Sequence, residues 1–193
     1  MQTLQFMNDP QPWRTLATRT AFKNRWLTVE TDDVQLPSGQ QYEYTRLVGP
    51  GIGVAVIGFN AAGEILLERE YRHGVGEVIW QLPGGLIHEG EELIIGGLRE
   101  LEEETGFAPA QVTSESVRYL GAVWDNPGFG NMTSHIVAAW GLEHTGNTHL
   151  DPTEFVSLHW VTMDWLKEAV RSGEVKERTT VAALAYLMLL ETL

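Results

Sequence analysis

A glycine turn followed by an acid-rich helical segment constrains this chain more than any other feature. The segment spans residues 85–107 and reads GLIHEGEELIIGGLRELEEETGF. Its second half has helical spacing, with Ile94, Leu98 and Leu101 on one side. The preceding run, residues 77–85, is typical of a strand that ends in a turn. We therefore expect a strand that passes through a tight glycine turn into a helix.

Three glutamates project from one side of that expected helix. Glu100, Glu103 and Glu104 are three and four positions apart, and this spacing places them on one helical face. Like charges at this spacing destabilise a bare helix, but they become favourable where hard divalent cations bind. Oxygen ligands suit Mg²⁺ or Mn²⁺ better than zinc. We expect these carboxylates to be metal ligands, joined by the backbone carbonyl of Gly84, which no Cβ shields.

Two more residues of the same motif have a supporting role. Arg99 can pair with Glu103 one helical turn later, or with Glu91 across the loop, and both alternatives are open at this stage. Either pairing would hold carboxylates in place. We therefore count Arg99 and Glu91 among the catalytic residues because they would position the metal ligands, and we do not expect them to contact the substrate. An acidic helix alone is usually a solvated surface, but the glycine turn and the fixed spacing together favour a functional motif.

On these residues the chain resembles the Nudix hydrolases. Three further stretches are similar to the ADP-ribose and related nucleoside diphosphate-sugar pyrophosphatases: WLTVETDDVQLPSGQQYEYTRL, EREYRHGVGEVIWQLPGGLIHEGEE and NPGFGNM. The resemblance covers most of residues 25–185. It implies hydrolysis of the pyrophosphate bond of a nucleoside diphosphate sugar, best matched by ADP-ribose, which gives AMP and ribose 5-phosphate. It also implies Mg²⁺, replaceable by Mn²⁺, on Gly84, Glu100 and Glu104, with Glu103 nearby.

The substrate has several alternatives within this resemblance. Met132 stands where the branch usually carries a glutamate, shortly after its Pro-Gly-Phe, and this departure leaves the exact sugar open. GDP-mannose, a dinucleoside polyphosphate and a damaged nucleotide are the rival substrates. A rival of another class is a non-catalytic module that senses a nucleotide sugar, although the intact carboxylate set argues against it.

The general base that deprotonates the attacking water has three candidates. The resemblance implies a catalytic glutamate in a late loop, and Glu154 is the preferred residue there. Asp151 in the same loop is weaker. Glu103 competes from within the motif itself.

Four residues outside the motif are candidates for substrate binding. Arg72 ends a strand before the motif and resembles the arginine that this branch uses on phosphates, for which a guanidinium suits bidentate binding. Arg46 is a weaker candidate of the same kind. Trp26 and Phe129 lie in segments that could reach the site and stack on a base, although core packing explains most aromatic residues.

Charge and composition exclude several classes of protein. The net charge of −13, from 26 acidic and 13 basic side chains, repels nucleic acid, so we expect a small anionic substrate neutralised locally. No apolar run of the length needed to span a bilayer is present. The chain has no cysteine, and its first residues do not resemble a secretory signal. We expect a cytoplasmic protein that binds neither nucleic acid nor membranes.

The order of elements predicts an α+β protein, a Nudix-type α/β/α sandwich with a mixed sheet and an N-terminal β extension. Residues 1–20 are expected to be an arm, followed by a hairpin of residues 26–36 and 41–48. We expect residues 1–48 to mediate dimerisation, because alternating strands outside a core need another surface. The resemblance likewise implies a homodimer. Residues 49–193 are the expected catalytic domain, with the remaining strands at 51–59, 64–72, 116–124, 134–142 and 154–162 and helices at 91–105, 164–173 and 179–193.

Overall fold

The computed structural model describes residues 9–150, 153 and 155–190, and the chain divides into two compact units. One unit contains Met1–Pro50 together with the loop Asn126–Asn131. The other contains Gly51–Asp125 and Met132–Leu193. The motif and the expected helix carboxylates all belong to this second unit.

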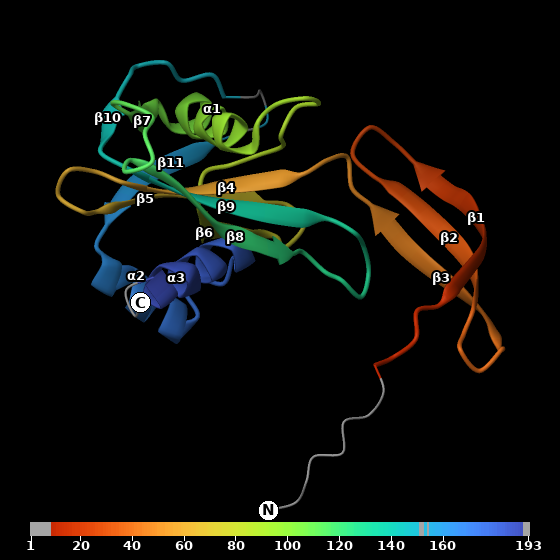
Figure 1. The fold of residues 1–193 in the computed structure, drawn as a ribbon. Helices are drawn as coiled ribbons and strands as arrows, with labels where there is room; N and C mark the ends of the chain where they lie inside the picture. Colours follow the sequence, from red (N-terminus) through yellow and green to blue (C-terminus); the bar gives the residue numbers. More distant parts are fainter. Residues whose placement is uncertain (1–8, 151–152, 154, 191–193) are drawn as a thin grey trace, which may run out of the picture. The chain divides into compact units, whose positions relative to one another are not determined.

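The first unit is a three-stranded antiparallel sheet of β1 (Arg14–Lys23), β2 (Thr28–Gln35) and β3 (Gln41–Val48), in that order (Figure 1). Strands β2 and β3 form the expected hairpin, with Gln35 opposite Gln41. The expectation of an arm is wrong for β1, which pairs with β2 along its whole length. All ten residues of β1 are exposed, so it has no buried face and no apolar period in its sequence.

The second unit is built on a six-stranded mixed sheet. Strand β4 pairs in parallel with β9, and the other pairings are antiparallel. The order is β11-β5-β4-β9-β8, with β6 also on β5, and the strands are β4 (Gly53–Phe59), β5 (Ile65–Arg72), β6 (Glu77–Gln81), β8 (Val117–Trp124), β9 (Thr133–Trp140) and β11 (Val156–Val161). Two short strands, β7 (Phe107–Pro109) and β10 (Leu142–His144), form a separate pair that the sequence did not predict.

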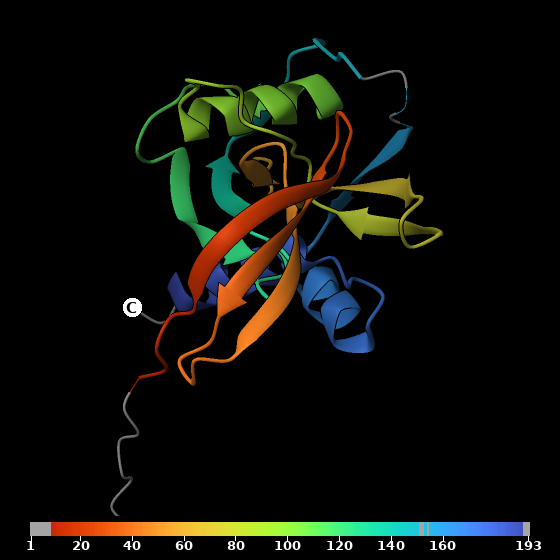
Figure 2. The same ribbon diagram turned by 90° about the vertical axis from the view of Figure 1, so that its right-hand side faces the viewer.

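Helices cover both faces of this sheet. Helix α1 (Leu93–Thr105) lies on one face, and α2 (Met163–Ser172) and α3 (Arg178–Leu190) lie on the other, as Figures 1 and 2 show from two directions. This arrangement confirms the α/β/α sandwich. None of the described helices has the length and apolar character that crossing a bilayer requires.

Strand β5 divides its side chains between the two faces, because successive residues of a strand point in opposite directions. Leu66 packs with Leu98 and Leu101 of α1. Ile65 and Leu67 belong to the cluster on the α2 and α3 side. The residues that follow Leu66 at every second position, up to Arg72, therefore share the face of the sheet that carries α1.

Two consecutive glycines let α1 approach the sheet closely. A Cβ placed on Gly97 would lie 2.9 Å from Val54 Cγ2, and one on Gly96 would lie 2.6 Å from Ile87 Cδ1. Glycine inside a helix costs about 1 kcal/mol relative to alanine. Close packing against β4 and the Ile87 segment explains why the helix carries two.

A larger side chain at Gly97 should destabilise the protein. We expect Gly97→Leu to lower the free energy of unfolding by about 1–3 kcal/mol, because overpacking outweighs the gain in helix propensity. Ile95→Ala is the matched control on the exposed side of α1, and it should change stability by less than about 0.5 kcal/mol. Urea unfolding of both variants measures this. A Gly97→Leu protein as stable as wild type would contradict the close approach.

Candidate functional site

The turn between β6 and α1 is fastened to the end of strand β4. The carbonyl of Pro83 accepts a hydrogen bond from Val56 N–H, and that of Gly85 accepts one from Val54 N–H, both at 2.9 Å. Backbone groups of the turn are thus satisfied by the sheet. Backbone hydrogen bonds alone therefore hold the turn against β4, without any side chain of the motif.

Both glycines of this turn lie very close to neighbouring atoms, and at Gly84 these are backbone atoms that cannot move aside. A Cβ on Gly84 would lie 2.1 Å from the carbonyl oxygen of Val54. A Cβ on Gly85 would lie 2.5 Å from Glu100 Oε2. The N–H of Gly84 donates to Glu104 Oε2 at 2.6 Å. The absence of a Cβ on Gly84 therefore lets the turn lie against the Val54 backbone, and its absence on Gly85 lets the Glu100 carboxylate lie against the turn.

Arg99 contacts three carboxylates at once. Its Nε and Nη2 bind the two oxygens of Glu91 at 2.8 and 2.9 Å, and Nη2 also donates to the carbonyl of Leu86. Its Nη1 donates to Glu100 Oε1 and Glu103 Oε2, both at 2.9 Å. Both of the alternative pairings expected for Arg99 are present together. The guanidinium thereby offsets the repulsion among like charges on α1.

These contacts shift two pKa values in opposite directions. Hydrogen bonds from Arg99, and then from the backbone N–H of His88, lower the pKa of Glu91 to about 2. The same pairing with Glu91 raises the pKa of Arg99. The Glu91 carboxylate is therefore ionised at neutral pH, and this keeps the bidentate pair intact.

The donors around the turn suit a hard divalent cation. The expected ligands Glu100, Glu103 and Glu104 provide only oxygen, and the first and last lie against the Gly84–Gly85 turn, where no Cβ fills the space. Within the described residues, no three acidic or histidine side chains are already gathered around one point. Arg99 instead holds Glu100 and Glu103. By donor chemistry, these residues suit Mg²⁺ or Mn²⁺.

A cavity of about 1110 Å³ opens beside the glycine turn, and both Gly84 and Gly85 line it. Arg72, the expected phosphate ligand, lines the same cavity from the end of β5. Its guanidinium binds Glu70 Oε2 at 3.0 Å and Gln81 Oε1 at 2.8 Å. The side chain remains 48% exposed, so part of it is open to a ligand.

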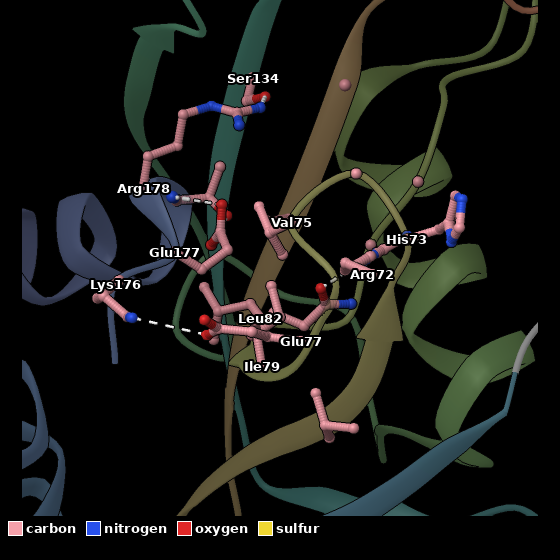
Figure 3. Close-up of a pocket in the computed structure, with 18 of the residues that line it drawn as sticks. Arg72, His73, Val75, Glu77, Ile79, Leu82, Ser134, Lys176, Glu177 and Arg178 are labelled. Atoms are coloured by element: carbon pink, nitrogen blue, oxygen red, sulfur yellow. Dashed lines mark hydrogen bonds and ion pairs between the residues drawn. The ribbon is translucent and has the colours of Figure 1, made fainter. Parts of the chain in front are cut away.

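Two cations on the opposite wall were not predicted from the sequence. Figure 3 shows Lys176 and Arg178 across the pocket from Arg72. Lys176 Nζ lies 3.7 Å from Glu77 Oε2, and Arg178 Nη2 lies 2.8 Å from Asp125 Oδ1. They lie at the junction of α2 and α3, where no motif marks them. Only the folding of that junction over the cavity identifies them.

The carboxylate of Glu177 fixes this wall at the start of α3. It accepts hydrogen bonds from the backbone N–H groups of Thr179 and Thr180, at 3.0 and 2.9 Å. Burial raises its pKa, but the hydrogen bonds from both threonines outweigh burial and lower the pKa overall. A charged cap of this kind stabilises the helix N-terminus, where Arg178 is the first helical residue.

Three of the expected substrate-binding residues lie in the first unit. Arg46 binds Asp32 and Glu30 at 2.7 and 2.6 Å. Trp26 is exposed and lies under the guanidinium of Arg25. Phe129 is half exposed, and its backbone oxygen accepts a hydrogen bond from Leu47 N–H. The structure thus brings together Arg72 and the motif but gives Arg46 carboxylate partners within its own sheet.

The preferred general base and its weaker rival lie outside the described residues. These are Glu154 and Asp151. Glu103, the third candidate, is 39% exposed and bonded to Arg99. All three remain predictions.

Comparison with known protein families gives two matches that follow the two units. The NUDIX domain matches residues 49–183. The nucleoside diphosphate sugar hydrolase N-terminal domain matches residues 13–47. This segment contains all of β1 and β2 and all but the last residue of β3. Both matches agree with the resemblance seen in the sequence.

Individual relatives cover nearly the whole chain. A methanol dehydrogenase activator of Bacillus methanolicus is 33% identical, and an ADP-ribose pyrophosphatase of Bacillus subtilis is 32% identical; each alignment covers 93% of this chain and 95% of the relative. A crystal structure of an ADP compounds hydrolase has the same fold, with a TM-score of 0.83, 22% identity and coverage of 95% of this chain and 96% of that one. The chain therefore belongs to the Nudix family, as a hydrolase of the ADP-ribose pyrophosphatase type.

Proposed function

We propose that this hydrolase cuts the pyrophosphate bond of a nucleoside diphosphate sugar, namely ADP-ribose, and that it requires Mg²⁺ or Mn²⁺. One observation carries the proposal. The cavity lined by Arg72 is also lined by Gly84 and Gly85, against which Glu100 and Glu104 lie. A cation and an oxygen-rich metal site beside one cavity match the needs of a doubly charged pyrophosphate group.

A bound metal ion would offset the repulsion between an anionic substrate and the carboxylates of an acidic protein. The chain carries a net charge of −13 and has four carboxylates gathered around Arg99 and the turn: Glu91, Glu100, Glu103 and Glu104. When bound, Mg²⁺ would neutralise phosphate charge and lower the pKa of a water molecule. Gly84, Glu100, Glu103 and Glu104 would hold it. Arg99 and Glu91 would keep these ligands in position.

The chain's other residues bind substrate and remove a proton. Arg72 binds a phosphate oxygen through its guanidinium. Glu154 accepts the proton of the attacking water, with Asp151 and Glu103 as its rivals. Arg46 is proposed as a second phosphate contact, and Trp26 and Phe129 as residues that stack on the base.

The choice of ADP-ribose rests on the relatives as well as on the site. The ADP-ribose pyrophosphatase of Bacillus subtilis and the methanol dehydrogenase activator of Bacillus methanolicus are almost equally similar to this chain. The second name describes an effect on another protein and leaves the hydrolytic substrate unnamed. The glycine turn and carboxylates favour catalysis over a purely sensing module.

A substrate panel tests the function. Purified protein with Mg²⁺ is given ADP-ribose, GDP-mannose, a dinucleoside polyphosphate and an oxidised nucleotide, and kcat/KM is measured for each. We expect ADP-ribose to have the highest value, with AMP and ribose 5-phosphate as products. Binding of ADP-ribose without turnover of any substrate would instead support the sensing module.

Loss of one metal ligand should abolish activity without unfolding the protein. We expect Glu104→Gln to lower kcat by more than about a hundredfold, because it removes charge and a ligand but little volume. Excess EDTA should likewise abolish wild-type activity, and added Mg²⁺ or Mn²⁺ should restore it. Glu102→Gln is the matched control: Glu102 is on the same helix but contacts Asn147, and we expect activity within about threefold of wild type. Full activity in EDTA would contradict metal dependence.

Three variants identify the general base. If Glu154 accepts the proton, Glu154→Gln should lower kcat strongly with little change in KM, because the side chain acts in the transition state. Asp151→Asn should have a smaller effect. A mild Glu154→Gln together with a severe Glu103→Gln would assign the role to Glu103. Circular dichroism of each variant controls for folding.

We also propose a homodimer formed through the first unit. This unit leaves large apolar side chains exposed, including Leu16, Phe22 and Tyr42 of the sheet and Trp13 just before it. Exposed apolar side chains on a small sheet are typical of a surface that another chain covers. Light scattering at micromolar concentration should give the mass of two chains, and the mass of one chain would refute the dimer.

A further inference from the structure

A polar network on β5 and β6 leads from the interior of the second unit to the cavity. Glu68, Glu70 and Arg72 alternate along β5 and so share one face. Gln81 of β6 lies directly opposite Glu68 in the antiparallel register. These four side chains lie on the face that carries α1, and both Arg72 and Gln81 line the cavity.

The amide of Gln81 connects the members of this network. Its Nε2 donates to Glu68 Oε1 at 2.5 Å and to Glu70 Oε2 at 2.9 Å. Its Oε1 accepts a hydrogen bond from Arg72 Nε at 2.8 Å. Glu70, which accepts from Gln81, also forms a 3.0 Å ion pair with Arg72. Arg72 is therefore held at two points on its guanidinium.

Only an amide satisfies all of these partners. Two carboxylates face one side of residue 81 and a guanidinium faces the other, so the residue must donate on one side and accept on the other. A glutamate would place a third carboxylate against two that are buried. A leucine or methionine would offer neither a donor nor an acceptor.

Burying this network has a desolvation cost, which suggests that the network has a function other than stabilising the fold. Glu68 is fully buried, and Glu70 and Gln81 are only 8% and 4% exposed. Buried carboxylates are no more stabilising than well-packed apolar side chains of similar size. The neighbouring positions Ile65, Leu66 and Leu67 are apolar and fully buried, so the strand does not need charge here to pack.

From this geometry we propose that Gln81 is a positioning residue which, with Glu70, fixes the guanidinium of Arg72 toward the phosphate of the substrate; the inference rests on the proposed role of Arg72 in phosphate binding. A half-exposed arginine has many rotamers, and each phosphate contact would otherwise cost the entropy of ordering it. Holding Nε and one Nη leaves the remaining donors oriented before substrate binds. Gln81 therefore acts on affinity through Arg72, without touching the substrate itself.

A double-mutant cycle tests this dependence. The variants are Gln81→Met, Arg72→Ala and the double variant, and the readouts are the Kd for ADP with Mg²⁺, measured by calorimetry, and kcat and KM for ADP-ribose. Gln81→Met should raise Kd and KM by about tenfold with kcat within about threefold of wild type. In the Arg72→Ala background the same change should alter Kd by less than about twofold, because the effect passes through Arg72.

Two further variants separate positioning from folding. Glu64→Gln is the matched control, because it removes one carboxylate charge from the turn before β5, away from the cavity, where Glu64 accepts a hydrogen bond from Asn60 Nδ2, and its Kd should equal that of wild type. Glu70→Gln, alone and with Arg72→Ala, provides a second cycle if Gln81→Met does not fold, and it should show the same dependence on Arg72.

The outcomes distinguish this inference from the proposed function. Equal losses of affinity in both backgrounds, no loss from Gln81→Met, or a wild-type protein that binds no ADP would overturn the positioning role. Binding that shows the expected coupling, in a wild-type protein that hydrolyses no nucleoside diphosphate sugar, would support positioning and overturn the proposed function.

Discussion

The close approach of the Gly84–Gly85 turn to its neighbours is the constraint on which the candidate site depends. A Cβ at either position would overlap the Val54 carbonyl or the Glu100 carboxylate. Because Gly84 has no Cβ, the turn can pack against β4, and because Gly85 has none, the Glu100 carboxylate can lie on its other side; the N–H of Gly84 also binds Glu104. One steric condition thus joins the sheet, the helix and the acidic residues.

Arg99 offsets the charge repulsion on α1. Acidic side chains three and four positions apart repel one another, and the helix has no basic residue in its last turn. Arg99 binds Glu91 with a bidentate pair and reaches Glu100 and Glu103 with its remaining nitrogen. The same guanidinium that stabilises the helix therefore keeps two of the expected metal ligands, Glu100 and Glu103, together.

Alternation along β5 links the core to the cavity. Leu66 packs under α1, and Arg72, on the same face, reaches the cavity where the strand ends. Between them the strand changes from apolar to charged on one face while Ile65 and Leu67 remain in the core on the other. Glu68 and Glu70 resemble surface residues in the sequence, because nothing local indicates that Gln81 of β6 binds them or that they are buried.

Local patterns in the sequence determined the motif, the mixed α+β character and the helix face that carries Glu100, Glu103 and Glu104, because strand and helix periods and glycine turns depend on neighbouring residues. Strand β1 escaped such a prediction since all of its residues are exposed and it has no apolar period. Only the tertiary structure decided three other features of the site. Lys176 and Arg178 line the cavity, and Gln81 contacts Arg72. Arg46 pairs with carboxylates of its own sheet. These contacts join residues distant in sequence or on neighbouring strands, so they follow from strand register and layer packing, which the order of residues along one segment does not contain.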